Sequence, residues 1–512
     1  MERRSLRIQK LLAALGLLVA VLSPLGARAE TIELQLLQLN DVYEIGPVEG
    51  GRSGGLARVA TLLQQLKSQQ PRTLVVLAGD LLSPSALGTA VVDGERLQGR
   101  QMVAVLNRMG LDVATFGNHE FDLPEEALRK RLAESRFRWI SSNVRDRNGQ
   151  ALPGVENDQL LLFEGAHGGR FRLGIVGVTL PSNPAPYVRY SDVLSSVDRS
   201  ARQLRRRGAD AVVALTHLTL EQDQQLAASG APIDLILGGH EHENIQQLRL
   251  GSQSGRAGTP DPTCPRPGIW IGKADANARS VLVHSLRFET TNGCLQINSR
   301  LQPIDASLSP DPQLQADVEH WEDLAFSAFQ REGLQPRRVI SLSPIELDGR
   351  EAQVRNGSTG LTRLIGAAML RAAPGSDLAI YNAGSIRIDD RIPAGPVSDY
   401  DVIRVLPFGG TVEQVELTGK QLQTLLNTGQ SNRGSGGYLQ VSGVTAAPAG
   451  TWLIHGEPLM PQRRYRVAIN DFLLSGKEAH LGWLAEPSAD LVRLQSRGDW
   501  RQAVIQELQQ QR

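Results

Sequence analysis

The chain has 512 residues, and its 54 Lys plus Arg are balanced by 54 Asp plus Glu, which gives a formal net charge of +0 at pH 7. This balance excludes a global charge that would recruit nucleic-acid polymers or an anionic membrane surface, so any anion must be bound by local groups. A chain of this length is expected to form at least two domains.

The first residues read as a secretion signal, which predicts an exported protein, periplasmic or secreted. Basic residues within 3–10 precede an apolar run over 11–25, and Ala27-Arg28-Ala29 is a small-x-small cleavage signal. We therefore expect residues 1–29 to be a signal peptide. The pair Arg3-Arg4 also fits a twin-arginine signal, and the export route stays open. No segment reaches a comfortable membrane length, which predicts no stable membrane span.

Residues 31–302 read as a layered α/β domain. Short apolar runs alternate with stretches whose apolar residues recur at helical spacing, as in Leu56, Val59 and Leu63. Five apolar runs are followed at once by residues able to bind a metal: 34–39 by Asn40-Asp41, 73–78 by Gly79-Asp80, 113–116 by Gly117-Asn118-His119-Glu120, 211–215 by Thr216-His217, and 233–237 by Gly238-Gly239-His240-Glu241-His242. Because ligands gather beyond the carboxyl ends of strands in such sheets, we expect these turns to converge.

Convergence of these side chains predicts a two-metal site. Asp80 is the natural carboxylate bridge, and the rest of the shell is Asp41, Asn118, His217, His240 and His242. Imidazole and carboxylate ligands suit Zn, Mn, Fe or similar divalent ions, whereas two cysteines in the whole chain are too few for a thiolate site. Such ions polarise a phosphoryl oxygen and make hydroxide available near neutral pH, so the pattern predicts a hydrolase.

His119 is the candidate for leaving-group chemistry, because it lies between Asn118 and Glu120 in one of these turns. Its imidazole would stabilise or protonate the departing oxygen. Asp122, three residues later, would hold the ring through its second nitrogen.

Residues 303–336 read as a connecting helix, and residues 337–512 read as a second α/β domain with apolar runs at 378–381 and 466–469. Cys264 and Cys294 are the only cysteines. In an exported chain they form either one disulfide or two isolated thiols, and the sequence alone leaves both open.

The motifs resemble those of the 5′-nucleotidase family. Its calcineurin-like metallophosphoesterase domain is matched by Asn40-Asp41, Gly54-Gly55-Leu56-Ala57-Arg58, Gly79-Asp80, Gly117-Asn118-His119-Glu120-Phe121-Asp122, Thr216-His217 and Gly238-Gly239-His240-Glu241-His242. Its C-terminal domain is matched by Asn382-Ala383-Gly384-Ser385-Ile386-Arg387, Leu406-Pro407-Phe408-Gly409-Gly410 and Leu417-Thr418-Gly419. The resemblance implies a four-layer α/β/β/α metallophosphoesterase domain followed by a second α/β domain that binds substrate.

The resemblance also implies roles for individual residues. One metal would be held by Asp41, Asp80 and His242, the other by Asp80, Asn118, His217 and His240, and His119 with Asp122 would form the catalytic dyad. In the second domain, Arg355, Asn382 and Arg387 would hold phosphate or carboxylate oxygens, Phe408 and Phe472 would sandwich a nucleobase, and Glu478 would hold the ribose.

Two positions depart from the family pattern. The first metal turn usually reads Asp-x-His, and here it reads Asp41-Val42-Tyr43. Tyr43 is either a phenolate ligand to a ferric ion or a residue that packs beside a site with one ligand fewer. The ribose turn usually reads Gly-Gly-Asp and here reads Gly476-Lys477-Glu478, which keeps a carboxylate one methylene longer.

The expected function is an exported dinuclear-metal phosphohydrolase that releases phosphate from 5′-nucleotides by attack of a metal-bound hydroxide. Its partner would be a small nucleotide substrate rather than a nucleic-acid polymer. The alternatives are a 2′,3′-cyclic phosphodiesterase or a nucleotide-sugar hydrolase on the same scaffold, or a nucleotide-binding protein whose metal site has decayed.

Overall fold

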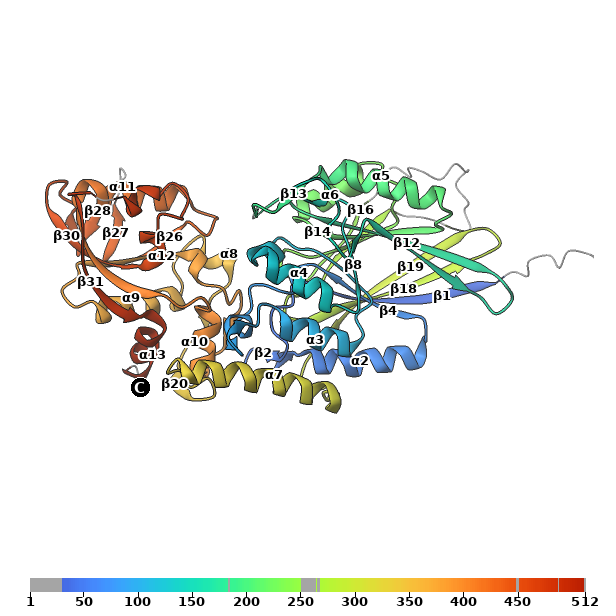
Figure 1. Cartoon of the computed structure of the whole chain (residues 1–512), viewed down its shortest axis with the longest axis horizontal. Helices are drawn as coiled ribbons and strands as arrows, with labels where there is room; N and C mark the ends of the chain where they lie inside the picture. Colours follow the sequence, from blue (N-terminus) through green and yellow to red (C-terminus); the bar gives the residue numbers. More distant parts are fainter. Residues whose placement is uncertain are drawn as a thin grey trace, which may run out of the picture.

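The computed structural model describes residues 30–182, 185–249, 264, 268–447, 451–486 and 488–510. The signal peptide expected over 1–29 lies outside these ranges. Figure 1 shows two lobes side by side, an N-terminal lobe coloured from blue to yellow-green and a C-terminal lobe in orange and red. In the described ranges, none of the helices combines the length and apolar character needed to cross a membrane.

The N-terminal lobe is built on two facing sheets. In spatial order the first contains β10 (Val155–Glu156), β8 (Arg138–Ile140), β7 (Val113–Thr115), β4 (Thr73–Ala78), β1 (Thr31–Leu39), β18 (Ser280–Glu289) and β19 (Cys294–Pro303). The second contains β11 (Asp158–Glu164), β12 (Arg170–Thr179), β14 (Ala211–His217), β15 (Leu235–Gly238), β17 (Ile269–Lys273) and β16 (Ile245–Arg249). The central strands of both sheets pair in parallel, which places their carboxyl ends at one edge.

Helices cover the outer face of each sheet. The helices α2 (Leu56–Gln69), α3 (Arg100–Met109) and α4 (Glu125–Glu134) pack on the first sheet, and α5 (Val193–Arg206) and α6 (Leu220–Ala228) pack on the second. Alternation along β1 explains the layering: Leu34 and Leu36 face the second sheet, whereas Leu37 and Leu39 face the helices. Each such burial contributes about 1.5–3 kcal/mol. The predicted four-layer α/β/β/α fold is confirmed.

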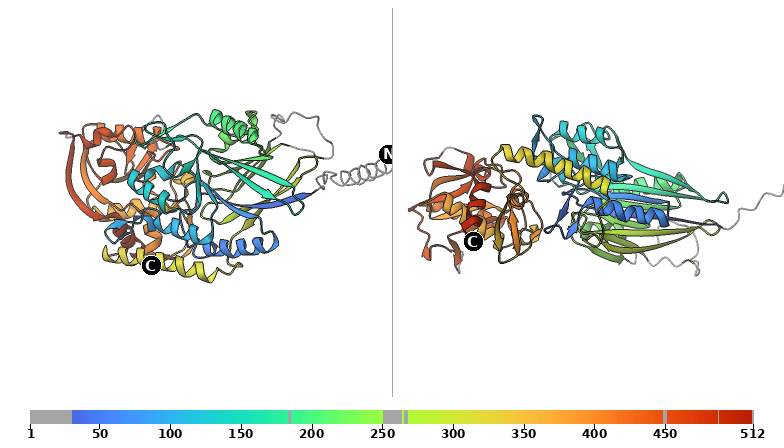
Figure 2. Two further views of the ribbon diagram at one scale, coloured as in Figure 1. Left: turned by 45° about the vertical axis from the view of Figure 1, so that its right-hand side comes forward. Right: turned by 90° about the horizontal axis from the view of Figure 1, so that it is seen from below.

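A long helix, α7 (Pro312–Arg331), runs from the N-terminal lobe to the C-terminal one. Figure 2, seen from below, shows it lying along the first lobe and reaching the second. The Asp311 carboxylate caps it by accepting a hydrogen bond from the Leu314 N–H at 2.8 Å, and Pro312 occupies its first turn. Its Phe326 ring packs on Tyr400 of the C-terminal lobe at 4.9 Å between centroids.

The C-terminal lobe has a five-stranded sheet in the order β26 (Leu439–Ser442), β22 (Leu378–Asn382), β30 (Arg464–Asn470), β25 (Thr411–Thr418) and β31 (Leu491–Asp499). The helices α9 (Gly360–Ala372) and α13 (Trp500–Gln510) pack on one face, and α11 (Gly419–Ser431) packs on the other. Short helices line the side toward the first lobe: α8 (Glu351–Val354), α10 (Asp399–Val405) and α12 (Asp471–Leu474). Short strand pairs surround them, among them β20 (Val339–Ser343) with β24 (Gly395–Ser398) and β21 (Leu347–Asp348) with β23 (Arg391–Ile392).

Of the two states left open for the cysteines, the structure has the disulfide. Cys264 and Cys294 are bonded, with their Cα atoms 5.6 Å apart. The bond ties Cys264 to the first residue of β19. It lies on the N-terminal lobe, in the half of the chain that carries the metal-binding turns.

Candidate metal centre and substrate cleft

The five metal-binding turns converge although they come from two sheets. β1, β4 and β7 of the first sheet and β14 and β15 of the second all end beside one another. Four of the candidate ligands, Asp41, Asp80, His240 and His242, have backbone φ angles of 52°, 55°, 84° and 59°. Left-handed backbone is costly for residues other than glycine, and such strain clusters at functional sites.

The core of the cluster is Asp41, Asp80 and His242, whose ligand atoms all lie within 4.8 Å of one another. His217 Nε2 lies 3.2 Å from Asp80 Oδ2 and 3.2 Å from Asn118 Oδ1. The His240 ring packs edge-on against His217 at 5.3 Å between centroids. The structure therefore brings all six predicted metal ligands together.

The imidazoles are oriented by partners on their far sides. His217 Nδ1–H donates to the Ala78 carbonyl at 2.8 Å, which leaves Nε2 facing Asp80. His242 Nδ1 is in close contact with a carboxylate oxygen of Asp389, a residue of the C-terminal lobe. Partners of this kind fix the tautomer of a histidine that binds a metal.

The buried carboxylates and imidazoles shift one another's pKa. Burial raises the pKa of the Asp80 carboxyl, but attraction to His217 and His119 outweighs it and holds the pKa well below the usual range. Burial lowers the pKa of His217, and attraction to Asp80 and Asp41 reverses this and raises it to about 9. Burial lowers the pKa of His240 to about 3, with repulsion from His217 acting in the same direction. The carboxyl groups of Asp41 and Asp80, whose pKa is lowered by neighbouring imidazoles despite burial, are thus ionised within the cluster.

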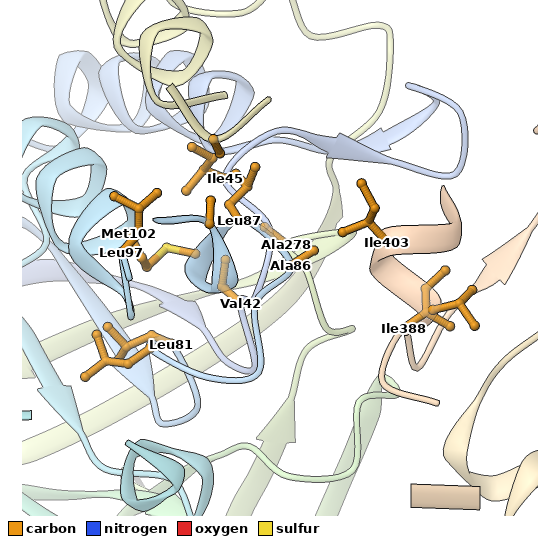
Figure 3. Packing of buried hydrophobic residues seen from close by; sticks show 14 of the residues in the cluster. Val42, Ile45, Leu81, Ala86, Leu87, Leu97, Met102, Ala278, Ile388 and Ile403 are labelled. Atoms are coloured by element: carbon orange, nitrogen blue, oxygen red, sulfur yellow. The ribbon is translucent and has the colours of Figure 1, made fainter. Parts of the chain in front are cut away.

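Neighbouring residues hold the ligand turns in place. The buried Glu120 carboxylate accepts backbone N–H groups of Asp80, Leu81 and Gly117 at 3.0, 2.7 and 2.5 Å. Any side chain at Gly117 would overlap the Asp80 carboxylate, which explains the glycine. Val42 and Leu81 follow the ligands Asp41 and Asp80, and both belong to the buried apolar cluster that Figure 3 shows from close by.

Tyr43 lies inside the cluster. Its hydroxyl donates to Asp80 Oδ2 at 3.2 Å and lies 2.9 Å from His242 Nε2. Burial, followed by the charges of Asp80 and Asp41, raises the pKa of Tyr43 well above its usual value. In this structure the phenol is a hydrogen-bond donor placed among the candidate metal ligands, a position that both interpretations of Tyr43 share.

His119 and Asp122 form a pair at the rim of the metal cluster. His119 Nδ1 lies 2.6 Å from Asp122 Oδ2, and its backbone N–H donates to Asp80 Oδ1 at 2.8 Å. Burial lowers the pKa of His119, but attraction to Asp80 and Asp122 outweighs it and raises the pKa. Arg387 of the C-terminal lobe reaches the same pair, with Nη2 3.3 Å from His119 Nδ1.

A cavity of about 500 Å³ opens between the lobes beside this pair. Its lining includes Asp122, Arg387, Asn382, Phe408 and Phe472. Phe408 and Phe472 are 55% and 40% exposed, whereas rings of this size are usually buried. The Arg387 guanidinium lies 5.8 Å from the centre of the Phe408 ring. The cavity therefore offers exposed aromatic rings that could stack on a flat ring and a guanidinium that could bind an anion attached to it.

Of the remaining predicted substrate residues, Glu478 is connected to the cavity and Arg355 is not among the residues that line it. Glu478 accepts a hydrogen bond from Asn382 Nδ2 at 3.0 Å, which connects it to the cavity. Arg355 is not among the residues that line the cavity. Its guanidinium is in close contact with the carboxylate of Glu351, a residue that the sequence analysis did not single out.

The donor set fits divalent metal ions. Carboxylate oxygens, an amide oxygen and imidazole nitrogens converge, and this mixture suits ions of the zinc, manganese and iron class. The two acids that would be shared or terminal ligands, Asp41 and Asp80, are fully buried, and buried carboxylates without a cation are costly.

Comparisons with known proteins agree with this geometry. A model of calcineurin-like phosphoesterases matches residues 34–244, and a model of the 5′-nucleotidase C-terminal domain matches residues 339–486. The 5′-nucleotidase of Bos taurus is 26% identical over 495 residues, which are 87% of this chain and 83% of that protein. A trifunctional nucleotide phosphoesterase protein of Bacillus subtilis is 24% identical over 487 residues, but the match spans 83% of this chain and only 31% of that protein.

The fold comparison points the same way. The crystal structure of a 5′-nucleotidase precursor from Thermus thermophilus aligns with a TM-score of 0.71 and 24% identity, covering 94% of this chain and 97% of that one. Fold and cluster thus define a metal-dependent phosphoester hydrolase with two lobes. The chain belongs to the 5′-nucleotidase family, in which a calcineurin-like phosphoesterase domain precedes a 5′-nucleotidase C-terminal domain.

Proposed function

We propose that the protein is an exported 5′-nucleotidase that releases phosphate from nucleoside 5′-monophosphates with two divalent metal ions. The observation that carries the proposal is that the cluster of candidate metal ligands lies next to the cavity between the lobes. The His119–Asp122 pair touches both the carboxylate–imidazole cluster and the cavity that holds Phe408 and Phe472. A phosphoryl group at the cluster therefore has a place for an attached base nearby.

The metal ligands divide into two sets that share Asp80. Asp41, Asp80 and His242 would hold one ion, and Asp80, Asn118, His217 and His240 would hold the other. When bound, such ions polarise a phosphoryl oxygen and supply hydroxide near neutral pH. The chain's contribution is to aim the ligands, which the far-side partners of His217 and His242 support.

His119 and Asp122 would act on the leaving oxygen. Asp122 holds His119 through Nδ1, so Nε2 is the atom that donates to the departing alkoxide. Arg387 would bind an oxygen of the same phosphoryl group through its guanidinium. Its Nη2 lies 3.5 Å from Asp122 Oδ2 and 3.3 Å from His119 Nδ1. His119 and Arg387 would stabilise negative charge that develops as the ester bond breaks, and Asp122 would orient them.

The C-terminal lobe would recognise the nucleoside. Phe408 and Phe472 would stack on the base, a contact worth about 1–3 kcal/mol that tolerates different bases. Asn382 and Glu478 would bind the sugar through their amide and carboxylate, and Arg355 would add positive charge near the phosphate. In this proposal residues 31–302 form the catalytic domain, 303–336 the linker helix and 337–512 the substrate domain, after removal of a signal peptide at 1–29.

A phosphate-release assay tests the proposal. The mature chain is stripped with chelator, reloaded with Zn, Mn or Fe(II), and given AMP. We expect turnover only in reloaded protein, and no turnover in Asp80→Ala, because that change removes the shared anion. Asp490→Asn, an exposed acid of the C-terminal lobe, is the matched control and should behave as wild type. Chelator-resistant turnover, or full activity in Asp80→Ala, would overturn the assignment.

A further inference from the structure

An acidic side chain lies where the substrate phosphate would meet positive charge. Glu351 opens the short helix α8, and its carboxylate is in close contact with Arg355 Nη2 and 3.9 Å from Arg387 Nη1. The side chains of Glu351, Arg355 and Arg387 are 23%, 24% and 12% exposed. We refer to these three residues as the charge triad. The two arginines of the anion site thus share one carboxylate between them.

The triad is fixed in place by backbone and by the other lobe. The Glu351 backbone N–H donates to Asp389 Oδ1 at 2.5 Å, and the other oxygen of Asp389 contacts His242 of the metal cluster. Glu351 is therefore tied, through one side chain, to the site where the phosphoryl group would react. This is a defined position at the lobe interface rather than a solvated surface acid.

Glu351 carries a negative charge at neutral pH. Burial raises the pKa of its carboxyl, but attraction to Arg355 and Arg387 outweighs burial and holds the pKa below the usual range. In the described part of the chain, Nε of Arg355 and Nε of Arg387 are buried without a hydrogen-bond partner. Buried donors left unpaired are costly, so the ion pairs with Glu351 are the contacts that hold these two guanidinium groups in place.

We propose that Glu351 is a specificity-determining residue that lowers the net positive charge of the phosphate site, so that the site discriminates less against monoanionic phosphodiesters than two unopposed arginines would. The inference rests on the proposed phosphoesterase function and adds the charge class of the substrate. Glu351 offsets one of the two positive charges that Arg355 and Arg387 would present to a phosphoryl group.

The charge states of the substrates make this selection effective at neutral pH. A phosphomonoester has its second pKa near about 6 and is mostly dianionic at pH 7. A phosphodiester keeps a single negative charge. A like charge held near the substrate opposes binding of the dianion more strongly than binding of the monoanion, and a partly desolvated site weakens the screening that would erase the difference. A 2′,3′-cyclic nucleotide is a monoanionic diester that the same nucleoside surface would accept.

The test compares two chromogenic probes with one leaving group, p-nitrophenyl phosphate and bis(p-nitrophenyl) phosphate, on metal-loaded wild type and Glu351→Gln. We expect the ratio of kcat/KM for monoester over diester to rise about tenfold in Glu351→Gln, which corresponds to about 1.4 kcal/mol. The inhibition constant of inorganic phosphate at pH 8 should fall by a similar factor. Differences between the probes in size cancel, because each probe is compared with itself across variants.

Two further variants separate charge from shape. Glu351→Asp keeps the negative charge and should keep the wild-type ratio, even where total activity falls. Glu416→Gln makes the same charge change at a surface ion pair with Arg464 and should leave both constants unchanged. An unchanged ratio and phosphate constant in folded Glu351→Gln would overturn the inference, as would a shift of equal size in Glu351→Asp. If metal-loaded wild type hydrolyses neither the probes nor AMP, the proposed function itself fails; if it hydrolyses AMP but neither probe, the inhibition constant of inorganic phosphate alone decides the inference.

Discussion

At the scale of single residues, His119 is the side chain whose surroundings best define a chemical role. It combines a carboxylate on Nδ1, an arginine within 3.3 Å and a raised pKa, so it is poised as a donor. His119→Ala should lower kcat for AMP by about 10²–10⁴-fold and change KM little, because the contact strengthens as the leaving oxygen gains charge. Steady-state kinetics at saturating metal measure this.

A matched comparison tests the same role from the leaving-group side. p-Nitrophenolate leaves with little need for a proton, so His119→Ala should lose much less activity on p-nitrophenyl phosphate than on AMP. Equal losses on both esters would place His119 in metal-site architecture instead of leaving-group chemistry.

The exposed ring pair gives a second prediction at this scale. Phe472→Ala should lower kcat/KM for AMP by about 10- to 100-fold, since it removes a stacking surface worth about 1–3 kcal/mol. An alkyl phosphate has no base and should be hydrolysed as by wild type. Leu342→Ala, a truncation of another exposed apolar side chain in the same lobe, is the control and should affect neither ester. A comparable loss on the alkyl phosphate would exclude a base-stacking role.

The convergence of the candidate metal ligands could be predicted from the sequence because each follows an apolar strand, and the strand ends of a layered sheet meet at one edge. Asp389, Glu351 and Tyr43 show where this reasoning stops. Asp389 and Glu351 follow no such strand; they belong to the C-terminal lobe and reach the metal site only because the two lobes pack together. The contacts of the Tyr43 hydroxyl with Asp80 and His242 likewise could not be predicted from the sequence, because they depend on how the turns meet in the folded protein.

At the scale of secondary-structure elements, the periodicity of apolar residues predicted which segments form strands and helices. It did not predict which of these elements are neighbours in the fold. The run at 73–78 became β4 with the same bounds, and the run at 233–237 shifted to Leu235–Gly238. Nothing in those runs indicated that three of the five strands lie in one sheet and two in the other. The hairpin of β18 and β19, which extends the first sheet, carried no metal-binding turn to draw attention to it.

The helix α7 contains a half-buried acid, Glu322, that predicts a pH dependence. Burial and the neighbouring Glu44 raise the pKa of Glu322 to about 7, with Glu319 and Asp323 adding repulsion and Arg337 opposing it. Folding therefore raises this pKa above the ordinary value of 4.5, so the folded state binds more protons than the unfolded state between those values. The contribution of Glu322 to stability is lost as pH rises through that window.

Glu322→Gln should remove this loss. Relative to wild type it should gain about 2 kcal/mol of unfolding free energy at pH 8 and almost nothing at pH 4.5, since one pKa unit corresponds to about 1.4 kcal/mol and partial exposure reduces the effect. Urea unfolding midpoints at the two pH values measure it. Glu319→Gln, on the exposed side of the same helix, should show no such pH-dependent gain. Equal gains at both pH values would refute the titration argument.

At the scale of the whole molecule, the C-terminal lobe participates in the metal site through Asp389. A carboxylate on the far nitrogen of a metal-binding histidine orients the ring and raises its basicity, and its loss typically costs about 10–100-fold in metal affinity. Asp389→Asn should therefore raise the metal dissociation constant by that factor, as measured by competition with a chromogenic chelator. Asp490→Asn removes an acid from the same lobe far from the cluster and should leave the constant unchanged.

This contact also couples the two lobes, because a coupling free energy acts in both directions. If Asp389 strengthens metal binding through His242, then metal binding must strengthen the attachment of the segment around Asp389 to the N-terminal lobe. Metal addition should slow hydrogen exchange over residues 386–392 in wild type and much less in Asp389→Asn. Equal protection in both proteins, together with an unchanged dissociation constant, would mean that the lobes meet at His242 without energetic consequence.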